Sequence, residues 1–166
     1  MTADGLVTNQ PWIPLGITFA DCFPIYLVDP VNHAVGLVHG GWRGIIQHIQ
    51  AEAVRAMSRQ YGSNPKDLLV GIGPGIHACC FYVLEPEEEQ FEEAVPDMQG
   101  WMRKADNKWY IDLPGICRRA LLEEGIKPEN LEVSEMCTSC RDDMFFSYRR
   151  DCGMTGRMAA LISIRG

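Results

Sequence analysis

The 166-residue chain has 46% hydrophobic and 22% charged residues, an ordinary composition for a globular protein with a substantial core. It contains no run of about 18 apolar residues that could span a bilayer, and its first residues lack the basic and apolar regions of a signal peptide. A formal charge of −7 argues against general nucleic-acid binding. We therefore expect a cytoplasmic protein with no membrane partner and no nucleic-acid partner.

Apolar periodicity predicts more strands than helices. In chain order, we expect strands at 6–8, 16–19, 20–28 and 34–39, a helix over about 42–61, a strand at 68–72, a helix over 86–95, a loop at 96–107, a strand at 109–111, a helix over 114–124, and strands at 131–134, 144–148 and 158–164. Asp112 is the expected N-cap of the third helix. This pattern predicts one domain of the α/β or layered α+β class, with a mixed sheet and flanking helices.

The two apolar runs on either side of residues 29–32 predict a β-hairpin. If the turn places Val28 opposite His33, the same register places Cys22 opposite His39. Directly opposed residues of an antiparallel pair have Cβ atoms about 4.5–5.5 Å apart. The thiol and the imidazole are then close enough to share a metal ion or a proton.

A paired cysteine and histidine support three chemistries that the spacing does not separate. Cys22 and His39 fit a nucleophile with its base, two of the three protein ligands of a catalytic zinc, or soft ligands for copper. A third zinc ligand is expected from His77, because His33 lies at the far end of the hairpin and His48 falls on the predicted helix.

Three arginines are expected near this face. Arg43 lies in the glycine-rich run after His39, and Arg149 and Arg150 follow the apolar run 144–148. A guanidinium group binds phosphate or carboxylate through two parallel hydrogen bonds. We therefore expect these arginines to bind an anionic substrate.

Seven cysteines, an odd number, do not predict a disulfide framework in a reducing compartment. Cys137 and Cys140 have the spacing of half a zinc-ribbon site. Cys79 and Cys80 are adjacent, and we expect that they cannot supply the other half. The sequence therefore predicts no structural zinc at these residues.

Four motifs, in order along nearly the whole chain, resemble the laccase-domain family, first called multicopper polyphenol oxidase and now described as purine nucleoside phosphorylases. They are Ala20-Asp21-Cys22-Phe23-Pro24, Val38-His39-Gly40-Gly41-Trp42-Arg43-Gly44, Gly71-Ile72-Gly73-Pro74-Gly75-Ile76, and Phe145-Phe146-Ser147-Tyr148-Arg149-Arg150-Asp151 with Thr155-Gly156-Arg157-Met158-Ala159. The resemblance implies a layered fold like the cysteine-hydrolase domain of cytotoxic necrotising factors. It also implies phosphorolysis of adenosine, inosine, guanosine and methylthioadenosine, and deamination of adenosine.

The resemblance also implies one metal ion, usually zinc; copper is the alternative cofactor. Its cysteine ligand matches Cys22 and one histidine ligand matches His39, whereas the other histidine belongs to a Gln-Val-His motif upstream of Ala3. The sequence begins after that motif, so we expect an N-terminally shortened laccase domain over 1–166. Either His77 replaces the missing ligand or the metal is lost.

The predicted function is a metal-dependent purine nucleoside phosphorylase with adenosine deaminase activity, whose partners are purine nucleosides and phosphate. Cys22 and His39 are the expected catalytic and metal-binding residues, and Arg43, Arg149 and Arg150 the expected phosphate ligands. The open alternatives are an amide hydrolase with a cysteine nucleophile, a copper-dependent polyphenol oxidase, for which four histidines are few, and an inactive metal-binding remnant. The oligomeric state is not predicted.

Overall fold

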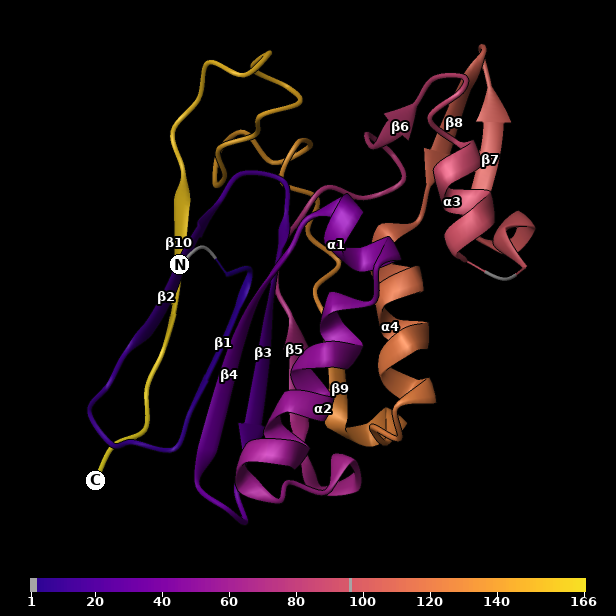
Figure 1. The fold of residues 1–166 in the computed structure, drawn as a ribbon. Helices are drawn as coiled ribbons and strands as arrows, with labels where there is room; N and C mark the ends of the chain where they lie inside the picture. Colours follow the sequence, from indigo (N-terminus) through magenta and orange to yellow (C-terminus); the bar gives the residue numbers. More distant parts are fainter. Residues whose placement is uncertain (1–2, 96) are drawn as a thin grey trace.

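The computed structural model describes residues 3–95 and 97–166 and is built around a five-stranded sheet (Figure 1). The strand order is β1 (Gly5–Thr8), β4 (Ala34–Gly40), β3 (Phe23–Asp29), β5 (Leu69–Ile72) and β9 (Leu131–Val133). Only β5 and β9 run parallel, and the other neighbours are antiparallel. The predicted mixed sheet of a layered α+β fold is thereby confirmed.

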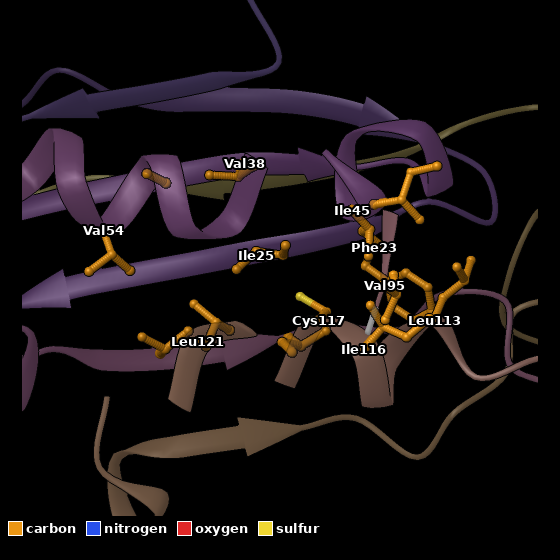
Figure 2. Close-up of a cluster of buried hydrophobic side chains, with 14 of the residues drawn as sticks. Phe23, Ile25, Val38, Ile45, Val54, Val95, Leu113, Ile116, Cys117 and Leu121 are labelled. Carbon is orange, nitrogen blue, oxygen red and sulfur yellow. The ribbon is translucent and has the colours of Figure 1, made fainter. Parts of the chain in front are cut away.

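Three helices cover one face of this sheet: α1 (Trp42–Ile46), α2 (Ile49–Tyr61) and α4 (Leu113–Glu123). The main core lies between them and the sheet, and Figure 2 shows Ile25 of β3 between Val54 of α2 and Leu121 of α4. All three side chains are fully buried. The amphipathic stripes of α2 and α4 therefore fix which way these helices face.

A two-stranded sheet of β2 (Leu15–Phe19) and β10 (Met158–Ile162) covers the other face. Its contact with the main sheet is a smaller core, in which Phe19 and Ala160 pack with Leu37 of β4. The main sheet is thus covered on both faces, and the ends of β2, β3 and β4 meet at one edge of the molecule.

The third sheet has the order β6 (Tyr82–Val83), β8 (Lys108–Ile111), β7 (Met102–Ala105), and α3 (Glu89–Ala94) lies between β6 and β7 in the chain. Three short 3₁₀ helices complete the structure: η1 (Pro65–Asp67), η2 (Met98–Gly100) and η3 (Pro128–Asn130). In the described part of the chain, no helix has the length and apolar character needed to cross a membrane.

Three predicted elements were wrong. The expected loop 96–107 contains β7, because Asp106 and Asn107 both adopt positive φ (51° and 57°) and form the tight turn of a β7–β8 hairpin. The expected helix 42–61 is divided in two by His48, whose φ is 59°. The expected strand 144–148 is absent, because residues 144 and 148 lie in turns and residues 145–147 are irregular.

The hairpin β3–β4 forms as predicted, but in a different register. Asp29 pairs with Ala34, so Pro24, and not Cys22, lies opposite His39. The reason is the Asp29 side chain, whose Oδ1 accepts hydrogen bonds from the backbone N–H groups of residues 31 and 32, each at 2.9 Å. These bonds form an Asx turn that holds Asp29 in the strand and leaves residues 30–33 as the loop.

Candidate active site

Cys22 and His39 nevertheless lie together at one end of the hairpin. Cys22 directly precedes β3 and His39 is the second-last residue of β4. A Cβ atom at Gly41 would lie 3.5 Å from Cys22 Sγ and 3.7 Å from His39 Cε1. Both functional groups therefore border the same backbone position, and the absence of a side chain at Gly41 leaves the space between them open.

These two residues line a cavity of about 520 Å³. Its walls are formed by Thr18, Phe19, Ala20, Asp21, Cys22, His39, Gly40, Trp42, Ile76, Phe81, Leu113, Tyr148, Arg149 and Arg157. The volume is in the range of cavities that bind small organic ligands, and aromatic walls with a few polar groups are typical of such sites.

Burial has the largest effect on the protonation of Cys22. Burial, together with the Asp21 carboxylate and against the opposing charge of Arg157, raises the pKa of the Cys22 thiol to about 11. The imidazole Nδ1 of His39 lies 3.5 Å from Oδ1 of Asp4. A carboxylate at Nδ1 orients the ring and leaves Nε2 free to bind a metal ion or exchange a proton.

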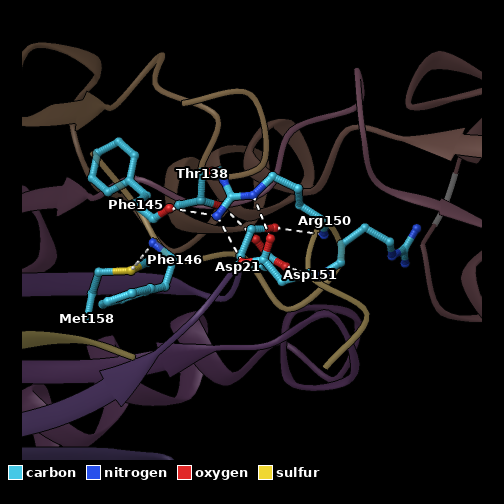
Figure 3. Close-up of polar contacts among 9 residues, drawn as sticks. Asp21, Thr138, Phe145, Phe146, Arg150, Asp151 and Met158 are labelled. Atoms are coloured by element: carbon cyan, nitrogen blue, oxygen red, sulfur yellow. Dashed lines mark hydrogen bonds and ion pairs between the residues drawn. The ribbon is translucent and has the colours of Figure 1, made fainter. Parts of the chain in front are cut away.

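Asp21 connects the cavity to the segment 134–157. Its carboxylate is 7% exposed and accepts two hydrogen bonds of 2.7 Å, from Thr138 Oγ1 and from the backbone N–H of Arg149 (Figure 3). Asp21 itself has a φ of 81°, a conformation that Asp tolerates better than most residues. The residue before Cys22 thus holds the loop that supplies Arg149 to the cavity.

Two arginines line the cavity. Arg149 lies with its guanidinium carbon 4.6 Å from the centre of the Tyr82 ring, and its Nη1 donates to the Tyr82 carbonyl at 3.0 Å. Arg157 is exposed, and its Nη1 donates to the carbonyls of Thr155 and Gly156. Sequence reasoning missed Arg157 as a site residue, although it lies in the fourth motif.

The two other predicted arginines do not line the cavity. Arg43 lies over the indole ring of Trp42, at 4.1 Å from its centre. Arg150 pairs with Asp151 at 2.8 and 2.9 Å and donates to the carbonyl of Phe145. Arg150 therefore holds the loop in shape instead of facing the cavity (Figure 3).

His77 does not join Cys22 and His39. It lies outside the cavity lining, its ring packs edge-on against Phe23 at 5.9 Å between centres, and burial lowers its pKa. In residues 3–95 and 97–166, no set of three ligand atoms within 4.8 Å of one another includes Cys22 or His39. This geometry does not support His77 as the third metal ligand beside Cys22 and His39, and that role stays a prediction.

The four cysteines for which we expected no metal site lie together. The sulfur atoms of Cys79, Cys80, Cys137 and Cys140 are all within 4.8 Å of one another, a set that can hold a metal ion. The expectation that Cys79 and Cys80 cannot complete a set with Cys137 and Cys140 was wrong, because these adjacent cysteines were judged only by their sequence spacing. Here Cys79 and Cys80 belong to a loop that places both sulfurs near Cys140, at 3.5 and 3.4 Å.

The environment of Cys137 favours its thiolate. Burial raises the pKa of this thiol, but hydrogen bonds from the backbone N–H groups of His77, Cys140 and Ser139 hold the pKa below its ordinary value. None of the seven cysteines, all of which lie in the described residues, forms a disulfide.

Comparison with known proteins decides the family. The model of the family described as multi-copper polyphenol oxidoreductase laccase matches residues 1–165. The chain belongs to this laccase-domain family. The resemblance inferred from the four motifs is therefore confirmed.

Relatives with the same domain are named as phosphorylases. The chain is 38% identical over 164 residues to purine nucleoside phosphorylase YlmD of Geobacillus stearothermophilus, covering 98% of this chain and 60% of that protein. It is 34% identical over 166 residues to the human purine nucleoside phosphorylase LACC1, covering 98% of this chain and 38% of that protein.

The fold agrees with these relationships. The crystal structure of YlmD from Geobacillus stearothermophilus superposes with a TM-score of 0.92 at 38% identity, over 99% of this chain and 62% of that one. The chain thus spans about three fifths of the length of this bacterial relative. The activity of the whole relative is therefore a proposal for this chain.

Proposed function

We propose that this chain acts as a metal-dependent purine nucleoside phosphorylase within a laccase domain over 1–166. One observation carries the proposal: a single cavity brings together the Cys22–His39 pair, aromatic walls and two arginines. The names of the relatives support the reaction class, since both bacterial and human relatives are called purine nucleoside phosphorylases.

The substrates fit different walls of the cavity. A purine base is flat and aromatic and would pack against Phe81 and the edge of Trp42, which both line the cavity; the faces of the Trp42 ring are covered by Phe91 and Arg43. Phosphate is a dianion that Arg149 and Arg157 would bind with charge-assisted hydrogen bonds. In our proposal Arg43 and Arg150, which sequence reasoning included, do not contact phosphate directly, and Arg150 acts by holding the loop that carries Arg149.

The proposed reaction exchanges one bond at the anomeric carbon. A phosphate oxygen attacks C1′ of the ribose, and the bond between C1′ and the purine nitrogen breaks with its electron pair going to the base, which takes up a proton. The products are ribose 1-phosphate and the free base. Holding phosphate and nucleoside in one cavity lowers the entropic part of the barrier.

Cys22 and His39 fit two places in the ligand set of a catalytic zinc, because thiolate and imidazole are preferred zinc ligands and Gly41 leaves space between them. A bound zinc would supply Lewis-acid chemistry and a water of lowered pKa. Cys22 would bind it as a thiolate, and Asp4 would orient the His39 ring. The third protein ligand that such sites use is not among the described residues near this pair.

Adenosine deamination is the second activity we propose for the cavity: water would add to C6 of the base, and the amino group would leave as ammonia. Two other readings find less support. A thiol with a raised pKa is a poor nucleophile for an amide hydrolase. A multicopper centre needs several imidazoles, whereas no clustered ligand set in the described residues includes a histidine. Inactivity is an outcome of the experiment below.

The test is product analysis of adenosine incubated with the purified, reduced chain, with and without phosphate. We expect adenine and hypoxanthine only when phosphate is present, and inosine from deamination in both cases. Since the free thiols suit a cytoplasmic protein, assays belong in reducing buffer. Adenine release that does not depend on phosphate contradicts the proposal, as does absence of any product from a sample shown to be folded.

A further inference from the structure

Four cysteines outside the cavity come from two segments that lie about sixty residues apart in the chain. We infer that Cys79, Cys80, Cys137 and Cys140 form a structural zinc site that fastens the segment 134–157 to the loop after β5. This inference does not depend on which reaction the cavity performs.

The sulfur geometry fits one tetrahedral ion. Zinc–sulfur bonds of about 2.3 Å place the sulfurs of a tetrahedral site about 3.8 Å apart. Here the sulfur of Cys140 lies 3.5 Å from that of Cys79 and 3.4 Å from that of Cys80, and all four lie within 4.8 Å of one another. Four sulfur ligands with no open position are typical of structural zinc. Each thiol that binds the ion gives up its proton to solvent.

The surroundings of the cluster suit a negative complex, since four thiolates and one Zn²⁺ carry a net charge of about −2. The backbone N–H of His77 points at Cys137 Sγ over 3.5 Å. The guanidinium of Arg149 donates to the carbonyl of Cys80 at 3.4 Å, and that of Arg150 donates to the carbonyl of Thr138 at 3.3 Å. Two positive groups are therefore bound to the backbone of the cluster itself.

The segment 134–157 needs such a fastening. In the described residues it contains neither a helix nor a strand, and irregular loops longer than about 12–15 residues are uncommon in compact domains. Its start is held by an isolated β-bridge between Gly75 and Cys137 and by a hydrogen bond of 3.0 Å from the backbone N–H of Thr138 to the Gly75 carbonyl. A zinc ion bound by the four cysteines would join the loop after β5 to the segment 134–157 beyond the point where their backbone hydrogen bonds end.

The position of the cluster connects it to the cavity. Thr138 lies between two of the proposed ligands, and its hydroxyl binds Asp21, the neighbour of Cys22. Cys80 directly precedes Phe81, which lines the cavity. We therefore expect the zinc to position two walls of the cavity without contacting a substrate.

The first experiment measures zinc per chain in protein purified with a thiol reductant. The background is Cys22→Ser, which removes the sulfur ligand in the cavity. We expect about one zinc per chain in this background, and loss of that zinc when Cys137→Ser and Cys140→Ser are added. Cys152→Ser is the matched control, because Cys152 is an exposed cysteine on the same segment outside the cluster, and it should leave the zinc in place. A zinc-free background protein, or zinc that survives the loss of Cys137 and Cys140, would overturn the inference.

The second experiment needs no cluster variant and therefore decides the matter even if the triple variant does not fold. Zinc-edge X-ray absorption of the Cys22→Ser protein should show only sulfur neighbours, at about 2.3 Å. A shell containing nitrogen or oxygen at about 2.0–2.1 Å would contradict a four-cysteine site.

Discussion

The hairpin β3–β4 and the segment 134–157 each contribute residues to the wall of the same cavity, and they are held in place by different means. The hairpin is held by a continuous backbone ladder, and Cys22 and His39 lie at its end because strand pairing brings them there. The segment 134–157 has no ladder after its single bridge to Gly75, and it is placed by side chains that meet Asp21 and by a cluster of cysteines. A wall made by backbone pairing tolerates changes in side chains better than a wall made by side chains alone.

The largest effect is expected at the end of the hairpin. Cys22→Ala should reduce phosphate-dependent base release at least about 100-fold, because it removes a metal ligand and leaves the imidazole of His39 without its partner. Initial rates at saturating phosphate measure the effect, and Cys152→Ala, an exposed cysteine elsewhere, is the control. Unchanged activity in Cys22→Ala would remove Cys22 from the mechanism.

The next effect tests the link between the two walls. Asp21→Ala should lower the free energy of unfolding by about 2–4 kcal/mol, because it leaves the Thr138 hydroxyl and the Arg149 N–H without their acceptor. Asp21→Asn keeps one acceptor oxygen and the tolerance for positive φ, so we expect about half of that loss. Urea unfolding measures both variants. Equal stabilities of wild type and Asp21→Ala would show that the buried carboxylate does not hold the segment.

A smaller loss of stability is expected where Gly75, which forms the β-bridge to Cys137, packs against Phe23. A Cβ atom at Gly75 would lie 2.4 Å from two ring carbons of Phe23, a fully buried side chain. Gly75→Ala should therefore destabilise the fold by about 1–3 kcal/mol. Gly71→Ala is the matched control, since nothing lies within 4 Å of its Cβ position, and it should change stability by no more than about 0.5 kcal/mol. Thermal unfolding measures the stability of both variants. Equal stabilities of Gly75→Ala and Gly71→Ala would contradict the close contact between Gly75 and Phe23.

Phosphate affinity should respond more weakly. Arg157→Lys keeps the charge but loses the planar pair of donors, so we expect KM for phosphate to rise about 3–10-fold with little change in kcat. Arg43→Lys is the comparison variant, because Arg43 stacks on Trp42 outside the cavity lining. A larger effect from Arg43→Lys than from Arg157→Lys would reverse our placement of phosphate.

The smallest effect concerns the turn that sets the hairpin register. Burial raises the pKa of Asp29, but the nearby Ser63 hydroxyl and the hydrogen bonds that the Asp29 carboxylate accepts from Asn32 and Val31 outweigh it and lower the pKa below its ordinary value. A lowered folded-state pKa gives stability that is present above the unfolded pKa of about 3.9 and is lost as the pH falls through the folded value. Asp29→Asn should therefore cost about 1 kcal/mol at neutral pH and nothing in strong acid. If Asp29→Asn lost the same stability at every pH, the loss would come from the shape of the side chain and not from the charge of the carboxylate.

The sequence predicted local structure well because its signals are local. Alternating apolar residues identified β1, β2, β3 and β4, and Asp112 caps α4 as expected by accepting from the backbone N–H of Gly115. The predicted hairpin register was wrong by two residues, because it placed Cys22 opposite His39 where the structure has Pro24. The Asx turn at Asp29 sets the register through a side chain, and apolar periodicity does not report such an effect.

The four-cysteine cluster could not be predicted in the same way. Its members meet because the loop after β5 and the start of 134–157 run side by side, and that depends on contacts such as the Gly75–Cys137 bridge and the burial of Phe23 under Gly75. Arg157 was missed for a related reason: it directly precedes β10, and the pairing of β10 with β2 places it at the cavity. The proximity of Cys22 and His39 was predicted because the hairpin brings its two ends together, although the predicted register that paired them was wrong.

The most direct test of the proposed function is to follow inorganic phosphate by ³¹P NMR while the folded, reduced chain acts on adenosine. We predict that one ribose 1-phosphate forms for each adenine released and that the phosphate signal falls by the same amount. Adenine release with an unchanged phosphate signal would show hydrolysis, and an unchanged spectrum with intact adenosine would show that this chain does not perform the phosphorylase reaction.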